Sequence, residues 1–251
     1  MILLKGRSSG PYTSVFCIVP ARAGSKGLPS KNSLLLNGLP LAEHTLLFAP
    51  LLTDFDNIIF TTDCKFLSSR SYLYPRVTYH LRDPHLSRDD TTLVDVILSL
   101  YSTIISPDAG LNPAFVLLQP TSPFRHVQEI KRALHFASVE GLDSLVSVSS
   151  IPYHPSECIN IDQQSWRYIV SPPGGATRRQ EYITPPFFIT GSFYLATLNH
   201  LSAYASFLSP VSSFFQTCEP YIVDIDTRAD LEVARALYSL MHRAGYAAPF
   251  K

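Results

Sequence analysis

The amino-acid sequence predicts an α/β domain built around a mostly parallel central sheet. Two observations indicate this fold class. Continuous apolar runs of strand length recur along the chain, and apolar segments of helix length alternate with them. Strands that alternate with helices imply right-handed crossovers, which place successive strands parallel in one sheet. The 251 residues are enough for one such domain with a small appendage.

The first strand is predicted at 15–19, where five apolar residues follow one another as in a strand covered on both faces. Similar runs predict further strands, and a weaker pattern predicts one more at 76–81. The stronger runs lie at 57–62, 115–118, 144–149 and 220–223.

Helices are predicted at 41–52, at 91–105 and at 126–139, between these strands. A last helix carries apolar residues at helical spacing, namely Leu231, Ala234, Tyr238 and Met241. Asp226 and Thr227 are its N-cap candidates, and His242, Arg243 and Gly245 mark its end.

The division of the chain follows from composition. Residues 1–14 contain Gly, Pro and Ser without periodicity and are expected to form a loose N-terminal leader. Residues 15–251 are expected to form the single domain. Within it, 151–190 is rich in Pro and polar residues, which predicts an excursion from the sheet of the kind that serves as a dimerisation arm.

Composition excludes several classes of function. Twenty basic and twenty acidic side chains give a net charge of zero, which offers no electrostatic attraction for a nucleic acid polymer or an anionic membrane. No stretch is long and apolar enough to span a bilayer, and the N-terminus lacks the apolar core of a signal peptide. The four cysteines are far apart and form no CxxC pair, which favours free thiols. We expect a soluble, cytoplasmic protein.

In an open α/β sheet, ligands bind beyond the carboxyl ends of the strands, and four unusual segments follow predicted strands. The first is PARAGSKGLPSKN at 20–32. Its glycines allow close approach of the backbone to an anion, and Arg22, Lys26 and Lys31 add three cations. The segment matches neither a Walker loop nor GxGxxG. A solvated basic loop would have the same residues, but the position after a buried strand favours a phosphate cradle.

The second segment is QPTSPFR at 119–125. Gln119, Thr121 and Ser122 carry neutral hydrogen-bonding groups that suit sugar hydroxyls, although Thr121 or Ser122 would equally cap the next helix. The third segment is YIVDID at 221–226. If it is a strand, Asp224 and Asp226 point to one face, where a magnesium ion between them would relieve their repulsion. Alternatively, Asp226 caps the last helix while Asp224 faces solvent.

The fourth segment, RDPHLSRDDTT at 82–92, leads into the helix at 91–105. Arg82 and Thr92 are candidates to hold a base edge or a ribose. The competing interpretation is ordinary helix capping by Asp89 or Asp90.

Together, the PARAGSKGLPSKN segment, the QPTSPFR segment, RRQ at 178–180 and the terminal DIDT resemble the cytidylyltransferases that activate sialic acids and related nonulosonates, the CMP-sialic acid synthetases. The resemblance runs from about residue 15 to residue 240. It implies a single Rossmann-like nucleotidyltransferase domain with a small dimerisation excursion, CTP and an acidic sugar as substrates, Mg²⁺ as cofactor, and a homodimer.

The resemblance also implies roles for individual residues. The triphosphate of CTP would be held by Arg22, Ser25, Lys26 and Lys31, the ribose by Asn32, and the cytosine by Arg82 and Thr92. Magnesium would be held by Asp224 and Asp226. The sugar would be contacted by Gln119, Thr121, Ser122, Tyr194 and, from the arm, by Arg179. The expected catalytic residues are Arg22, Lys31 and Asp226.

Two departures from the pattern of the family fall on the sugar side. Thr190-Gly191 stands where sialic-acid enzymes commonly have Asn-Gly, and His154-Pro155 is not followed by a lysine. They leave nucleotide binding intact and widen the set of acceptors to legionaminate, pseudaminate and other nonulosonates.

The expected reaction is attack by the anomeric hydroxyl of the sugar on the α-phosphate of CTP, with loss of pyrophosphate. Three alternatives stay open from the sequence. They are a nucleotidyltransferase for a different sugar or base, a catalytically silent nucleotide-binding regulatory protein of the same fold, and a glycosyltransferase, in which a metal-binding DxD usually lies mid-chain.

Overall fold

The computed structural model describes residues 12, 14–25, 27–52, 55–105, 112–151, 154–172, 174, 186–217 and 222–243. Their centre is a seven-stranded sheet with the order β11-β7-β10-β6-β1-β4-β5. Its strands are β1 (Val15–Pro20), β4 (Asn57–Thr62), β5 (Thr78–Leu81), β6 (Ala114–Leu117), β7 (Ser144–Ser150), β10 (Phe187–Thr197) and β11 (Ser213–Gln216). All pairs are parallel except those of β10, which runs antiparallel to both β6 and β7. The predicted α/β class with a mostly parallel sheet is confirmed.

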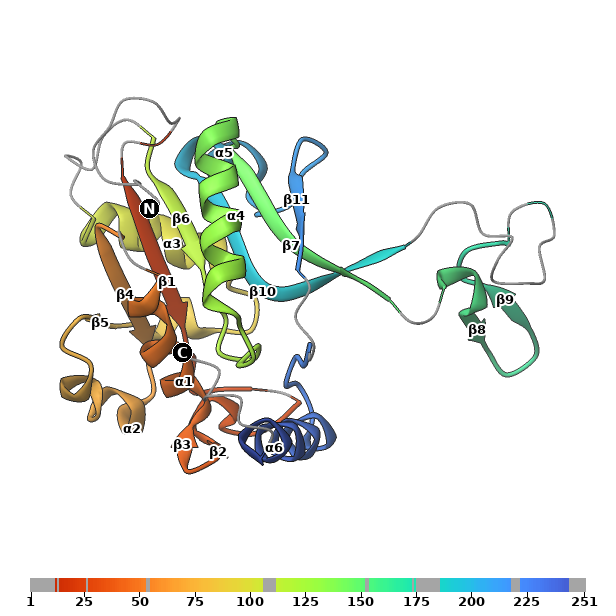
Figure 1. Ribbon diagram of the computed structural model, residues 1–251, viewed down its shortest axis with the longest axis horizontal. Helices are drawn as coiled ribbons and strands as arrows, with labels where there is room; N and C mark the ends of the chain where they lie inside the picture. The colour runs from red at the N-terminus through yellow and green to blue at the C-terminus, as the bar shows by residue number, and fades with distance from the viewer. Residues whose placement is uncertain are drawn as a thin grey trace.

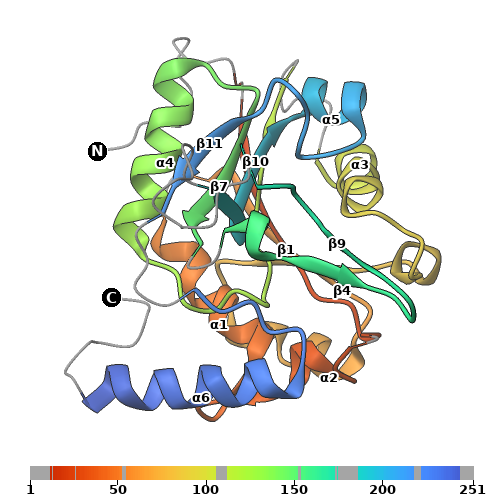
Figure 2. The same ribbon diagram turned by 90° about the vertical axis from the view of Figure 1, so that its right-hand side faces the viewer.

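Helices cover both faces of this sheet (Figures 1 and 2). On one face, α1 (Leu41–Phe48) and α4 (Val127–Glu140) pack on the larger apolar cluster. On the other face, α3 (Leu93–Thr103) and α5 (Leu198–Tyr204) pack on a second cluster. Because both faces are covered, β1 is buried along its whole length, as its continuous apolar run predicts.

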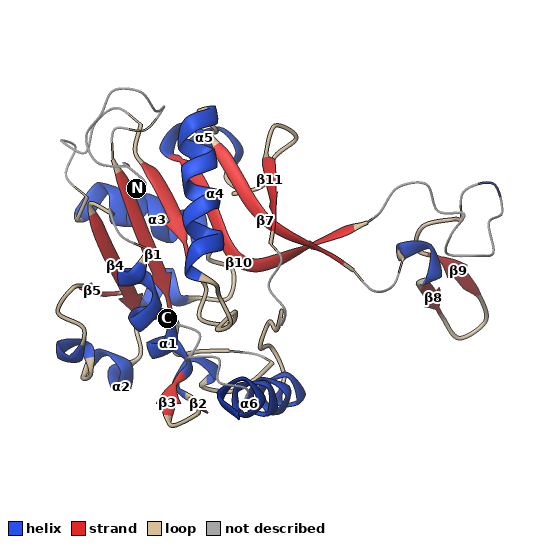
Figure 3. Cartoon of the chain, in the orientation of Figure 1, coloured by secondary structure: helices blue, strands red, loops and turns tan. Residues whose placement is uncertain are grey.

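Shorter elements complete the fold, which Figure 3 shows by type of secondary structure. Between β1 and α1 lie η1 (Lys31–Ser33), β2 (Leu35–Leu36) and β3 (Leu39–Pro40). The predicted helix at 41–52 divides into α1 and the short η2 (Ala49–Leu51). The other short elements are α2 (Lys65–Ser68), η3 (Ser71–Leu73), η4 (Pro84–Ser87) and η6 (Pro155–Glu157).

The last helix, α6 (Arg228–Arg243), lies away from the central sheet, against β2. Its buried residues meet Leu28, Leu36 and Phe124 in a third apolar cluster. Thr227, one of the two predicted caps, accepts a hydrogen bond from Asp230 N at 3.3 Å, and Asp230 accepts one from Thr227 N at 2.7 Å. The predicted end marker Gly245 lies outside the described residues.

The strand predicted at 220–223 is wrong for the residues that are described, because 222–226 is irregular backbone. The sheet ends instead at β11, which pairs with β7. Val223 and Ile225 are apolar because they pack into the cluster beneath α6, and Ile225 is fully buried there. The apolar run at 220–223 therefore reflects side chains buried under α6, and not a strand paired in the sheet.

The long strand β10 was not predicted from the sequence. Its apolar pattern is interrupted by Thr190, Gly191 and Ser192, and its register with β7 shifts between residues 189 and 194. Gly191 has φ +70° inside this bulge. Such interruptions hide a bulged strand from pattern-based prediction.

The predicted excursion is a small arm that projects from the ends of β7 and β10 (Figure 1). Its hairpin consists of β8 (Ile159–Ile161) and β9 (Trp166–Tyr168), which pair only with each other. All six hairpin residues are exposed.

Arg125 joins three elements behind the carboxyl end of β6. Its buried guanidinium donates to Ser192 O at 2.6 Å, to Thr45 Oγ1 at 3.1 Å and to Gln119 O. It thereby ties the 119–125 loop to β10 and to α1.

We predict that Arg125→Met lowers the free energy of unfolding by about 3 kcal/mol, since it leaves buried carbonyl groups without a donor. Urea unfolding measures this. The control is Arg132→Met, whose side chain is 69% exposed on α4. Equal stability of the two variants would contradict the role of Arg125.

Candidate active site

A cavity of about 280 Å³ opens at the carboxyl ends of β1, β5 and β6. One wall is the 20–32 loop, with Arg22, Ser25 and Asn32. The opposite wall is the 82–93 segment, and the floor is formed by Gln119 to Thr121. Three of the four segments singled out from the sequence therefore line one cavity, because parallel strands bring their carboxyl ends to the same edge of a sheet.

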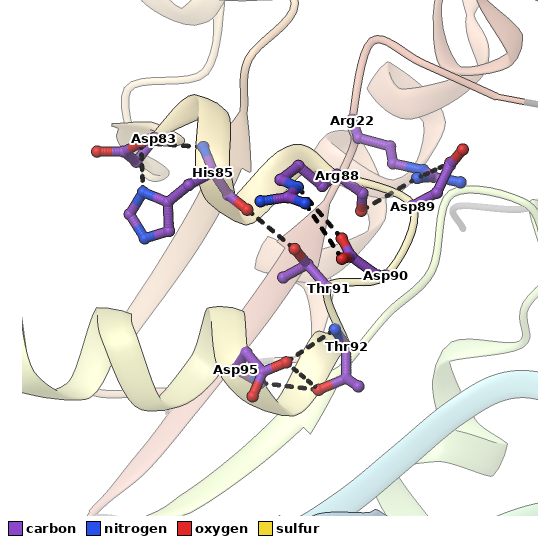
Figure 4. A network of polar contacts seen from close by, with 9 residues as sticks. All are labelled: Arg22, Asp83, His85, Arg88, Asp89, Asp90, Thr91, Thr92 and Asp95. Atoms are coloured by element: carbon purple, nitrogen blue, oxygen red, sulfur yellow. Dashed lines mark hydrogen bonds and ion pairs between the residues drawn. The ribbon is translucent and has the colours of Figure 1, made fainter.

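Arg22 reaches across the cavity to the opposite wall. Its Nη1 lies 2.7 Å from Asp89 Oδ1 and 3.5 Å from the carbonyl oxygen of Arg88 (Figure 4). In the same turn, Arg88 Nε lies 3.4 Å from Asp90 Oδ1. Both ion pairs are largely exposed, so each contributes little to stability and its cation is available to a stronger anionic ligand.

Asp89 and Asp90 do not cap α3. The cap is Thr92, whose Oγ1 accepts a hydrogen bond from Asp95 N at 3.1 Å, while Asp95 accepts from Thr92 N at 2.9 Å. These bonds lower the pKa of the Asp95 carboxyl. The hydroxyl of Thr92 is thus engaged in a capping box. The residues that line the cavity at this point are its neighbours Thr91 and Leu93, and not Thr92 itself.

Lys31 and the C-terminal acidic segment meet at the edge of the cavity. Lys31 Nζ lies 2.7 Å from Asp226 Oδ1. The segment is held there by a 2.9 Å hydrogen bond from Ile225 N to Thr121 O. A Cβ atom on Gly27 would lie 2.8 Å from the carbonyl oxygen of Asp226, so only glycine allows the 20–32 loop this close.

Asp224 and Asp226 are both exposed and flank the buried Ile225. Both side chains are exposed, but the segment is not a strand, so the alternation that predicted a shared face does not apply to it. No group of three or more His, Cys, Asp or Glu side chains in the described part of the chain is arranged to hold a metal ion by itself.

Arg82 is a buried cation that lines the cavity, with an exposed fraction of 3%. Burial lowers its pKa to about 10; Asp63 raises the value and Arg22 lowers it. The side chain therefore stays charged at neutral pH. Among the described residues no carboxylate lies within ion-pairing distance of it.

Asn32 has an acceptor that no described residue satisfies. Its Nδ2 donates to Arg22 O at 3.0 Å, while its buried Oδ1 receives no hydrogen bond from the described chain. Buried polar atoms are nearly always paired, so an orphaned acceptor on a side chain that lines a cavity indicates a donor from a ligand.

The 119–122 loop does not cap α4, because that helix begins at Val127 with His126 as its N-cap. Gln119 and Thr121 line the cavity. Ser122 is buried and donates to Thr190 O at 3.4 Å, which joins this loop to the bulge of β10.

The bulge is held by buried hydroxyl groups. Thr190 Oγ1 donates to Ser147 Oγ at 2.8 Å and accepts from Ser192 N at 3.3 Å. In an Asx turn, the side-chain oxygen of an asparagine accepts a hydrogen bond from the N–H two residues later. Thr190 Oγ1 accepts this same bond from Ser192 N, so the threonine replaces the asparagine of an Asn-Gly pair in the turn.

Tyr194 follows this bulge and packs against Phe207, with ring centroids 5.7 Å apart. Burial, and secondarily the charge of Asp224, raise the pKa of the Tyr194 phenol. The hydroxyl therefore remains protonated at neutral pH and can donate a hydrogen bond to an anion.

Two site residues that the sequence did not single out are Asp63 and Thr91. Asp63 Oδ1 accepts from Ala23 N at 2.7 Å and so holds the 20–32 loop to the end of β4. Its position directly after a predicted strand was the available signal. Two predicted residues, Lys26 and Arg179, lie outside the described residues.

The chain matches the cytidylyltransferase family profile over residues 16–209. It is 31% identical over 220 residues to an N-acylneuraminate cytidylyltransferase of Streptococcus agalactiae, covering 85% of this chain and 51% of that protein. It is 32% identical to the CMP-N,N'-diacetyllegionaminic acid synthase of Legionella pneumophila, covering 92% of this chain and 98% of that protein. A pseudaminic acid cytidylyltransferase of Campylobacter jejuni is 24% identical, with 92% and 98% covered. The chain thus spans about half the length of the first relative and nearly all of the other two.

Solved structures show the same fold. A CMP:2-keto-3-deoxy-manno-octonic acid synthetase complexed with CTP superposes with a TM-score of 0.66 at 16% identity, covering 90% of this chain and 99% of that one. A 4-diphosphocytidyl-2C-methyl-D-erythritol synthase from Anaerococcus prevotii gives 0.58 at 14% identity, covering 90% and 98%. No helix in the described ranges is long and apolar enough to cross a membrane.

We predict that Gly191→Ala lowers stability by roughly 1–2 kcal/mol, because a left-handed backbone disfavours a side chain. Its Cβ would also lie 3.1 Å from Ser122 Oγ. Thermal melting measures the shift. Gly24→Ala is the control, since beyond its chain neighbours no atom would lie within 4 Å of the added methyl group. A lower melting temperature in the control than in Gly191→Ala would refute this account of the bulge.

Proposed function

Because this chain belongs to the cytidylyltransferase family, we propose that it transfers CMP from CTP to a nonulosonate sugar acid and releases pyrophosphate. The observation that carries the proposal is the concentration of Arg22, Lys31 and Arg82 around one cavity in a chain of zero net charge. A triphosphate needs such placed cations where water is partly excluded.

The nucleotide is assigned to the wall formed by the 20–32 loop. Arg22, Ser25, Lys26 and Lys31 hold the triphosphate. The unsatisfied Oδ1 of Asn32 accepts a hydrogen bond from the ribose. Arg82 holds the cytosine, and the start of α3 faces it through Thr91 and Leu93 in place of the predicted Thr92.

The acceptor is assigned to the side of the cavity formed by the 119–122 loop and β10. Gln119, Thr121 and Ser122 bind hydroxyl groups, and the protonated Tyr194 donates to the sugar acid. Arg179 of the arm contributes a cation for its carboxylate. The named substrates of the relatives make N-acylneuraminic, N,N'-diacetyllegionaminic and pseudaminic acids the acceptors to test.

In the proposed reaction, the oxygen of the anomeric hydroxyl forms a bond to the α-phosphorus, and the bond to the bridging oxygen of pyrophosphate breaks. Arg22 and Lys31 stabilise the negative charge on the departing pyrophosphate. Positioning and charge compensation supply most of the rate. An anomeric hydroxyl is more acidic than an ordinary alcohol, so its proton passes to solvent without a dedicated protein base.

Asp224 and Asp226 fit a magnesium ion that is shared with the nucleotide. Asp226 is paired with the cavity residue Lys31, and Asp224 is exposed two residues before it, with no third protein ligand among the described residues; this suits an ion held by one or two carboxylates plus substrate phosphates. When bound, magnesium would neutralise charge on the phosphate oxygens. Lys31, which pairs with Asp226 in this structure, would then be free to bind the phosphates.

We further propose that two copies of the chain associate through the arm. An isolated two-stranded hairpin is at best marginally stable in water. Ile159, Ile161, Trp166 and Tyr168 of this hairpin are 44%, 75%, 60% and 42% exposed, which marks a surface that another protein covers. In this proposal residues 15–251 form one domain, residues 151–190 are its dimerisation arm, and residues 1–14 are a leader. We also propose a cytoplasmic location, which the free thiols of Cys17, Cys64 and Cys158 suit.

The proposed activity is tested by pyrophosphate release from CTP and Mg²⁺ with each of the three sugar acids, using ATP, GTP and UTP as controls. We predict release with CTP and at least one acid, and a loss of about 100-fold or more in kcat/KM for Asp226→Asn. Glu232→Gln on α6, an exposed carboxylate in ion pairs with Arg228 and Arg235, is the matched control.

CTP binding without release for any acid would refute the proposed transfer and favour a nucleotide-binding regulatory protein. Full activity of Asp226→Asn would refute the metal assignment alone.

We predict that Trp166→Asp shifts the chain from dimer to monomer, since burial of an exposed aromatic anchor often contributes about 2 kcal/mol or more to an interface. Light scattering on a size-exclusion column measures the mass. Tyr72→Asp is the control, because Tyr72 is 77% exposed on η3. η3 directly follows α2, which lies on the opposite side of the molecule from the arm in Figure 1. A wild-type monomer would contradict the proposed dimer.

A further inference from the structure

One threonine holds the buried guanidinium of Arg82. Arg82 Nε donates to Thr61 Oγ1 at 3.3 Å, and Nη2 donates to the carbonyl oxygen of Thr61 at 3.0 Å. Both hydrogen bonds lie within the buried part of the molecule. Nη1 forms no hydrogen bond with any described residue, which leaves it for a ligand in the cavity that Arg82 lines.

Thr61 is itself rigidly placed. It belongs to β4, opposite Pro20 of β1 and His80 of β5. Its carbonyl oxygen also accepts a 3.0 Å hydrogen bond from Ala21 N, at the start of the 20–32 loop. The same peptide group therefore fixes the beginning of that loop and the position of Arg82.

The direction of the Thr61 hydroxyl follows from its neighbours. A guanidinium can only donate, so Thr61 Oγ1 accepts from Arg82 and its own hydrogen is free to point elsewhere. His80 Nδ1 lies 3.1 Å from Oγ1 and accepts that hydrogen when the imidazole is neutral. Burial, and secondarily the charge of Arg82, lower the pKa of His80 and keep it neutral.

Arg82 depends on these contacts more than a surface arginine would. It lies near the cation Arg22, and no described carboxylate pairs with it directly. Without a carboxylate to fix its orientation, the fork of the guanidinium is aimed by Thr61.

We propose that Thr61 is a positioning residue for nucleotide binding: its hydroxyl and carbonyl groups aim the guanidinium of Arg82 into the cavity. This inference rests on the proposed function for the identity of the ligand, CTP. The adjacent Thr62 has a different task, since its Oγ1 hydrogen-bonds to Ala21 O and accepts from Cys64 N at 3.0 Å, within the backbone turn after β4.

The test is isothermal titration of the full chain with CTP and Mg²⁺. Thr61→Val removes the hydroxyl at nearly constant volume, and we expect the Kd for CTP to rise about 10-fold, because a hydrogen bond to a charged group is lost. Thr61→Ser keeps the hydroxyl and should restore most of the affinity. Thr78→Val is the matched control, since Thr78 Oγ1 contacts only Asn57, at an exposed position on the neighbouring strand.

A double-mutant cycle distinguishes positioning from a general loss of structure. If Thr61 acts through Arg82, then Thr61→Val causes no further loss of CTP affinity in an Arg82→Met background. In turnover, the KM for CTP should rise while the KM for the sugar acid stays unchanged. Melting curves of each variant identify any that do not fold.

The inference is overturned by an unchanged Kd in Thr61→Val, by the same 10-fold loss in the Arg82→Met background, or by a wild-type chain that does not bind CTP. Failure of the proposed function has a different signature, namely wild-type CTP binding without pyrophosphate release. In that case the titrations still decide the role of Thr61.

Discussion

The parallel pairing of β1 with both β4 and β6 is the constraint on which the site depends. It brings the ends of these three strands to one edge of the sheet, and each end continues into a polar loop. Arg22 follows β1, Asp63 follows β4 and Gln119 follows β6. Since the strands are buried and cannot slide without exposing apolar side chains, the polar residues after them are held at fixed separations.

Backbone contacts then join these loops to one another. The Asp63 carboxylate accepts a hydrogen bond from Ala23 N, and the carbonyl oxygen of Thr61 accepts one from Ala21 N. The carbonyl oxygen of Thr121 accepts a hydrogen bond from Ile225 N, which brings the C-terminal acidic segment to the same edge of the sheet. Most of the site is thus organised before any ligand enters, and pre-organised groups lose less free energy on binding.

The cations of the cavity differ in how they are balanced. Arg22 and Lys31 have carboxylate partners, Asp89 and Asp226, whose side chains are 51% and 68% exposed. The Arg22 pair is weak because both of its side chains reach solvent. The Lys31 side chain is only 13% exposed, but its partner Asp226 is open to solvent. Arg82 is buried without a carboxylate partner in the described chain, so its charge favours a ligand that supplies acceptors. In the proposed function, the two kinds of cation serve the two parts of a nucleotide, the phosphates and the base.

Much of this was determined by the sequence alone. The apolar runs at 15–19 and 57–62 predicted β1 and β4, since a strand covered on both faces must be apolar throughout. The PARAGSKGLPSKN and QPTSPFR segments could be placed at one edge of the sheet because the rule for parallel strands requires no knowledge of contacts.

Tertiary structure alone decided the remaining features. The run at 220–223 was apolar for burial under α6, and local pattern does not distinguish that from pairing in a sheet. β10 was hidden by a bulge that is stabilised from β7, through Ser147. Asp89 as the partner of Arg22, and Thr61 as the support of Arg82, depend on hydrogen bonds and ion pairs between residues 67 and 21 positions apart. The register of the strands in the folded sheet determines which of these residues meet. The spacing of residues along the chain does not predict that register.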